Sequence, residues 1–116
     1  MAFNRGDIIE MYLDLPYQES SKPHPFAIIS NEDVFQEDGM YICVMLTHSP
    51  RIDKFSFEIT DDMLVKKGDG KFSQARCHLV VNVKGEHIIT NSNRNSMKKS
   101  SVDRLVSRIE ITALSQ

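Results

Sequence analysis

The chain has 116 residues, of which 41% are hydrophobic and 26% charged, and its formal net charge is −2. This length suits a single domain over residues 1–116 with an ordinary globular composition. The small negative charge argues against a protein that holds long nucleic acids by bulk electrostatics, but it allows a short single strand in a local basic groove. No apolar run approaches the ~20 residues of a membrane span, so no membrane partner is expected.

Strands dominate the predicted secondary structure. Six short segments are rich in β-branched, aromatic and other apolar residues, either continuously or in alternation with polar residues. The run 40–46 is the longest apolar one and is expected to be the central strand, whereas 55–59 alternates like an edge strand. A turn at Gly85 is expected to make a hairpin of the last two segments. In chain order, the predicted strands cover residues 8–13, 26–29, 40–46, 55–59, 75–83 and 87–90.

Polar segments with proline or glycine connect these strands. Three prolines make residues 15–25 a predicted loop, because proline cannot donate to a strand ladder. Ser30-Asn31 is a candidate cap for one short helix around Val34-Phe35. Asp38-Gly39 is a turn signal.

An amphipathic helix is predicted near the C-terminus. Ser100 and Asp103 have the spacing of a capping box, with Asp in place of the usual Glu or Gln. Several short strands followed by one helix predict a small barrel or sandwich with the helix packed on one side. The apolar stripe of this helix recurs at i, i+3, i+4 and i+7, and consists of Val102, Leu105, Val106 and Ile109.

The two cysteines, Cys43 and Cys77, lie inside apolar runs. Their spacing matches no zinc motif, so both are predicted to be buried thiols. No metal site and no cofactor are expected. With no signal peptide and no disulfide framework, the expected compartment is the cytoplasm.

Three segments of the first half carry a familiar pattern. Arg5-Gly6-Asp7-Ile8 opens the first predicted strand, residues 22–31 read Lys-Pro-His-Pro-Phe-Ala-Ile-Ile-Ser-Asn, and Thr47-His48-Ser49 ends the third strand. In this order they resemble the MazF/PemK family, the toxins of bacterial type II toxin–antitoxin pairs. The resemblance continues, less closely, through residues 73–80.

This resemblance implies a fold and a function. The fold is mainly β, a small SH3-like barrel with a short helix after the second strand and an amphipathic C-terminal helix. The function is that of a metal-independent endoribonuclease that cuts single-stranded RNA. The implied partners are the RNA, a second copy of the chain in a homodimer, and a cognate antitoxin that covers the groove.

Cleavage of RNA without a metal needs a base for the ribose 2′-OH, a cation for the phosphorane and an acid for the leaving oxygen. The resemblance implies that Thr47, at the end of the longest apolar strand, contacts the scissile phosphate, and that Ser49 assists it. A strand-end threonine can also simply bond the local backbone.

Arg76 and His78 are the second candidate pair. They are two residues apart, so their side chains share one face of a strand. The resemblance implies that Arg76 binds phosphate, while His78 stands where an acidic residue is frequent. An arginine beside a histidine can supply both a cation and a proton. The alternative is an ordinary exposed strand face.

His24 departs from the family pattern, which has Arg before the proline of the second strand. An imidazole cannot form the guanidinium fork, but it can act as an acid or base. His24 therefore either works with His78, marks a weakened or inactive nuclease, or is an exposed loop residue. Lys22 is a candidate for part of the missing charge, and Tyr17 in the long loop is a candidate for stacking a base.

Three functions remain open at this point. The first is a sequence-selective endoribonuclease toxin. The second is a degenerate member of the same fold that acts as a binding or regulatory module, which the histidine at position 24 favours. The third is an unrelated small β-barrel that binds a ligand or a protein, which leaves the matched segments unexplained.

Overall fold

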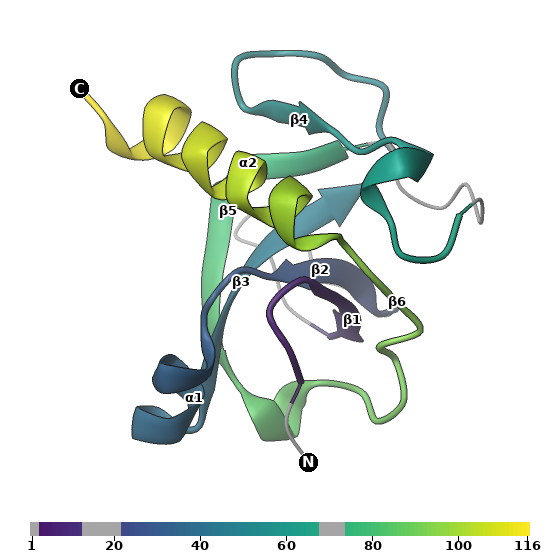
Figure 1. The fold of residues 1–116 in the computed structure, drawn as a ribbon, viewed down its shortest axis with the longest axis vertical. Helices are drawn as coiled ribbons and strands as arrows, with labels where there is room; N and C mark the ends of the chain where they lie inside the picture. Colours follow the sequence, from purple (N-terminus) through teal and green to yellow (C-terminus); the bar gives the residue numbers. More distant parts are fainter. Residues whose placement is uncertain (1–2, 13–21, 68–73) are drawn as a thin grey trace.

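The computed structural model describes residues 3–12, 22–67 and 74–116, and six strands form one antiparallel sheet (Figure 1). Across the sheet the order of the strands is β4-β5-β3-β2-β1-β6, so the longest apolar run is in the middle, as predicted. In chain order the strands are β1 (Asp7–Met11), β2 (His24–Ile28), β3 (Met40–Thr47), β4 (Ser56–Glu58), β5 (Gln74–Lys84) and β6 (Asn95–Ser96).

Two α-helices accompany the sheet. α1 (Glu32–Asp38) follows β2, and α2 (Lys99–Ile109) lies across one face of the sheet near β4 and β5 (Figure 1). The predicted cap of α1 is confirmed, because the Asn31 side chain accepts a hydrogen bond from the amide of Val34. Gly39 ends α1 in the left-handed region, at φ +67°. Single helical turns are η1 (Asp61–Met63), η2 (Gly85–His87) and the π-helical η3 (Glu110–Leu114).

Each face of the sheet carries its own hydrophobic core, because successive side chains of a strand point to opposite faces. Ile8 packs on the face covered by α2, and its neighbour Ile9 packs on the other. Cys43 and Cys77 are buried free thiols, as predicted, one in each core. The predicted stripe of α2 is also confirmed, since its side chains enter the core between α2 and the sheet. Val102, Leu105 and Ile109 are buried there, and Val106 packs against this core.

The Arg5-Gly6-Asp7 segment fastens distant parts of the fold together. Arg5 donates from Nε to the carbonyl of Ile29 at 3.1 Å and pairs through Nη2 with Asp103 of α2 at 2.9 Å. Asp7 is buried and accepts a hydrogen bond from the Ser96 hydroxyl of β6 at 2.7 Å. These residues therefore stabilise the fold, and they lie away from the pocket described below.

The predicted fold class is confirmed: the protein is mainly β, with a short helix after the second strand and an amphipathic C-terminal helix. The ladder of strand hydrogen bonds is nevertheless open, because β4 and β6 are its two edges. An isolated bridge between Leu64 and Met97 joins the segments that follow these edge strands.

Two local predictions are wrong. Residues 87–90 do not form a hairpin with β5, because the chain turns through η2 and then crosses to β1, where the amide of Ile89 donates to the carbonyl of Glu10. The predicted capping box of α2 is also absent. The helix begins earlier, with Lys98 as a cap that makes no side-chain bond, and the Asp103 carboxylate pairs with Lys99 and Arg5 instead.

Candidate active site

One pocket at the end of β3 brings together four of the predicted site residues. Its volume is about 330 Å³, and it lies between β3, β5 and the loop that follows β3. Thr47 and Ser49 come from the end of β3 and the loop, and Arg76 and His78 come from β5. The structure thus brings these four residues together, and the pocket is also lined by Met45, Arg51 and Leu79.

Local hydrogen bonds shape the loop after β3. The Thr47 hydroxyl accepts a bond from the amide of Ser49 at 3.2 Å, and the Ser49 hydroxyl accepts one from the amide of Arg51 at 3.3 Å. The backbone-bonding role considered for Thr47 is therefore present, and it coexists with a position in the pocket. These two turns hold both hydroxyls at the pocket wall.

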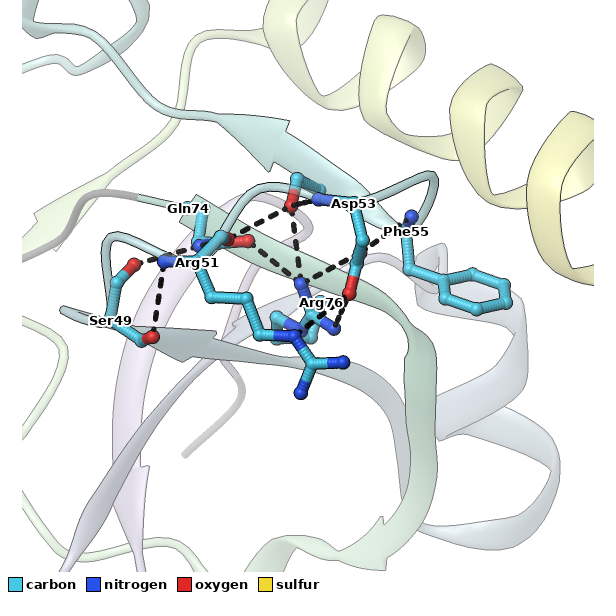
Figure 2. Close-up of polar contacts among 7 residues, drawn as sticks. Ser49, Arg51, Asp53, Phe55, Gln74 and Arg76 are labelled. Carbon is cyan, nitrogen blue, oxygen red and sulfur yellow. Dashed lines mark hydrogen bonds and ion pairs between the residues drawn. The ribbon is translucent and has the colours of Figure 1, made fainter.

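Gln74, the first residue of β5, ties this loop to the sheet. It is only 1% exposed. Its side-chain nitrogen donates to the carbonyls of Ser49 at 2.7 Å and Arg51 at 2.6 Å, and its oxygen accepts from Arg76 Nη1 at 3.1 Å (Figure 2). Every polar atom of this buried amide thus has a partner, as burial requires.

Arg76 is clamped by a carboxylate. Its Nη1 and Nη2 donate to the two oxygens of Asp53 at 3.0 and 2.9 Å, and Nη1 also donates to the Ser56 hydroxyl at 3.2 Å. The Arg76 side chain is 11% exposed and that of Asp53 is 26% exposed. The hydrogen bond from Arg76 is the main reason that the pKa of Asp53 lies at about 2. At neutral pH the carboxylate is therefore charged and offsets part of the charge of Arg76.

His78 lies two residues beyond Arg76, and its ring packs against that of Phe55, with 4.3 Å between the centroids. Burial, and secondly the positive charge of Arg76, lower the pKa of His78 below its ordinary value of 6.5. At neutral pH the imidazole is consequently uncharged, which is the form that can accept a proton.

The pairing of β3 with β5 is irregular next to the pocket. The register places Ala75 opposite Leu46 and Val80 opposite Val44, so β5 makes five steps where β3 makes two. Residues of β5 between these positions leave the regular ladder with β3, although Arg76 stays paired with Ser56 of β4. Strand irregularities of this kind commonly re-aim side chains next to active sites. Arg76 and His78 both belong to this stretch.

The remaining predicted site residues do not line the pocket. The prediction of a loop up to residue 25, with His24 exposed in it, is wrong: His24 is half-buried at the start of β2, where it pairs with Met11 of β1. The β2–β3 register sets Phe26 opposite Met45, and continuing it by two residues sets His24 opposite Thr47. β3 lies between β2 and β5, so it separates His24 from His78.

Lys22 is exposed just before β2, and Tyr17 lies outside the described residues. Three residues of the pocket and its frame, Arg51, Asp53 and Gln74, were not predicted. For Arg51 and Asp53, the only signal in the sequence is their position in the loop that follows Thr47 and Ser49. No such signal marks Gln74.

The cysteines offer no ligand or nucleophile to this pocket. Burial raises the pKa of Cys43 to about 12 and also raises that of Cys77, so both thiols stay protonated. Within residues 3–12, 22–67 and 74–116, no three His, Cys, Asp or Glu side chains gather as a metal site. No helix in these ranges is both long enough and apolar enough to cross a membrane.

Solved structures of small nucleases share this fold. An endoribonuclease from a mycobacterial species aligns with a TM-score of 0.71 at 11% identity, covering 100% of this chain and 97% of the other. A mycobacterial endoribonuclease in complex with its cognate antitoxin aligns with a TM-score of 0.68 at 13% identity, over 96% and 94% of the two chains. A MazE–MazF crystal structure from Deinococcus radiodurans gives 0.66 at 8% identity, over 96% and 94%. No curated protein sequence matches significantly.

The family assignment comes from the sequence match over nearly the whole chain. The family model of the PemK-like, MazF-like toxins of type II toxin–antitoxin systems matches residues 4–112. The chain therefore belongs to this family of toxins, as its three N-terminal segments predicted.

Proposed function

We propose that this protein is the toxin of a toxin–antitoxin pair and that it cuts single-stranded RNA without a metal ion. The observation that carries the proposal is the shared pocket of Thr47, Ser49, Arg76 and His78. It places two hydroxyls, a guanidinium and an uncharged imidazole around one cavity. Family membership and the endoribonuclease fold of the neighbours support the same activity.

The proposed reaction is attack of a ribose 2′-oxygen on the adjacent phosphorus. The 2′-O–P bond forms and the P–O5′ bond breaks, leaving a 2′,3′-cyclic phosphate and a free 5′-hydroxyl. His78 accepts the 2′-OH proton, Thr47 orients the phosphate with help from Ser49, and Arg76 stabilises the charge that develops on the phosphorane. His24, level with Thr47 on β2, is the candidate acid for the 5′-oxygen, and Lys22 and Tyr17 are candidate substrate contacts.

Purified protein is expected to cut single-stranded RNA into discrete fragments in the presence of EDTA. Thr47→Ala should slow single-turnover cleavage by about 10²–10³-fold, the usual effect of removing one positioned donor. Thr90→Ala changes an exposed threonine outside the pocket and serves as the matched control. Equal rates for both variants would contradict the role of Thr47.

A degenerate, non-cleaving member of the family is the second candidate function. The clamp of Asp53 on Arg76, together with the histidine at position 24, favours it, because both lower the positive charge offered to a phosphate. The variant His24→Arg distinguishes an active nuclease from a non-cleaving member of the family. If only this variant cuts RNA, the native protein is a binding or regulatory module. If neither form binds or cuts RNA, the nucleic-acid function itself is wrong.

The pH dependence of cleavage follows from the lowered pKa of His78. A base must be unprotonated, so the acidic limb of the pH profile should follow His78, with activity falling as the pH drops through its pKa, below 6.5. Arg76→Gln removes a positive neighbour that disfavours the imidazolium, so the pKa of His78 should rise. NMR titration of the His78 ring in both proteins measures this shift without relying on activity. A lower pKa in the variant would contradict the assignment.

We also propose two protein partners. The neighbours include an endoribonuclease bound to its cognate antitoxin and a MazE–MazF structure, so an antitoxin is the expected partner of this chain. The homodimer follows from the family resemblance alone. Light scattering on the purified protein tests it, and a monomeric mass at micromolar concentration would contradict it.

A further inference from the structure

We propose that Arg51 is the residue through which the pocket first binds an RNA phosphate. This inference rests on the proposed function in taking RNA as the ligand. The pocket contains two arginines in different states. Arg76 is 11% exposed and holds Asp53 with two hydrogen bonds, whereas the Arg51 side chain is 77% exposed and lines the same pocket.

The backbone of Arg51 is fixed although its side chain is exposed. Its amide donates to the Ser49 hydroxyl at 3.3 Å. Its carbonyl accepts from the Gln74 side chain at 2.6 Å and from the Ser56 hydroxyl at 3.3 Å. Three hydrogen bonds thus hold the Cα of Arg51 at the pocket wall, so the residue can reach a ligand without ordering a loop first.

The guanidinium of Arg51 is also oriented. Its Nε lies 3.4 Å from Asp53 Oδ2, the same oxygen that accepts from Arg76 Nη2 at 2.9 Å. Figure 2 shows the two terminal nitrogens of Arg51 turned away from this carboxylate. In the described parts of the chain, Asp53 is the single ionic partner of the Arg51 side chain. The edge with the terminal nitrogens matches the bidentate geometry of a phosphate.

Asp53 therefore holds Arg76 more firmly than Arg51, which gives the two arginines different roles. It accepts the shorter, paired bonds from Arg76 and only one longer contact from Arg51. An incoming phosphate can bind Arg51 by displacing only this weak contact with Asp53. Arg76 keeps its position and stabilises the charge that develops in the transition state. An interaction made equally in the ground state and the transition state changes KM and leaves kcat nearly constant.

The test compares Arg51→Ala, Arg51→Lys and Lys54→Ala. Lys54 is an exposed cation of the same loop that does not line the pocket, so its removal changes the net charge equally. Arg51→Ala should raise KM for single-stranded RNA about tenfold, as expected for one charge-assisted contact at an exposed site, with kcat within about twofold. Arg51→Lys should fall between wild type and Arg51→Ala, because a point charge replaces the fork.

Binding to 2′-O-methyl RNA, which lacks the attacking hydroxyl, separates this inference from the nuclease activity. For this probe the slope of log K against log salt should become shallower by about 0.7 in Arg51→Ala, the value of one phosphate contact on a single strand. Lys54→Ala should leave the slope unchanged. Weak binding by Arg51→Ala supports the role of Arg51 even if the wild type cuts no RNA. Equal binding by the Arg51→Ala and Lys54→Ala variants, or a loss confined to kcat, would overturn it.

Discussion

Replacing Arg76 by alanine is expected to reduce RNA cleavage by 10³-fold or more, since arginines that stabilise a transferring phosphoryl group contribute about 10³–10⁵ in rate. The loss has two physical sources. The guanidinium disappears from the pocket, and the Asp53 carboxylate, which is ionised at neutral pH even at the ordinary aspartate pKa of 3.8, loses its bidentate partner beside the phosphate site. Single-turnover rates at saturating protein measure the effect, and thermal melts show the accompanying loss of stability.

The double variant Asp53→Ala with Arg76→Ala separates these two sources. If repulsion by the unpaired carboxylate dominates, removing it restores part of the rate, and the two changes are strongly non-additive. If Arg76 acts directly on the phosphorane, the double variant remains as slow as the single one. Arg94→Ala removes an exposed arginine outside the pocket and is the matched control. A wild-type cleavage rate in the Arg76→Ala variant would contradict the assignment of this pocket as the active site.

Gly6→Ala is expected to be the most damaging small change to the fold. Gly6 has φ +96°, and an added Cβ would lie 2.8 Å from the carbonyl oxygen of Met97. Backbone strain of this kind costs about 1–3 kcal/mol, and the contact with a main-chain oxygen adds to it, because neither backbone can yield easily. Gly6 also joins two segments, as its amide donates to Ile28 and its carbonyl accepts from Met97.

Gly39→Ala provides the control for this stability measurement. Gly39 also has a positive φ, of +67°, but nothing lies within 4 Å of an added Cβ. Its substitution should lower the free energy of unfolding only by the penalty for placing alanine in the left-handed conformation, about 1–2 kcal/mol. Urea unfolding of both variants compares the two costs. Equal losses in the two variants would show that the Met97 carbonyl moves aside and that the close contact is unimportant.

Several elements were predictable because their signals are local. The run 40–46 is apolar throughout and lies between two strands, and the stripe of α2 recurs at helical spacing because one side of the helix faces the sheet. The Asn31 cap and the glycine at position 39 are chemical signals for the start and end of α1. In contrast, β6 has only two residues, Asn95 and Ser96, and no periodicity. It exists because it pairs with β1.

The segments that identify the family mostly build the fold. Arg5 and Asp7 hold α2 and β6, the Ser30 hydroxyl accepts from the amide of Ile42 on β3, and Asn31 caps α1. A resemblance carried by such residues is informative about topology. It is less informative about catalysis, because the pocket draws on the end of β3, the following loop and β5.

By itself the sequence determined the family, the mainly β class, the central strand, the buried cysteines and the C-terminal helix. It also named Thr47, Ser49, Arg76 and His78, which share a pocket. Only the tertiary structure decided that Asp53 clamps Arg76, that Gln74 fastens the loop, and that Arg51 is the exposed cation. These are bonds between residues more than twenty positions apart, or differences in exposure, and no local pattern encodes either. The fold makes them when β5 is placed beside β3.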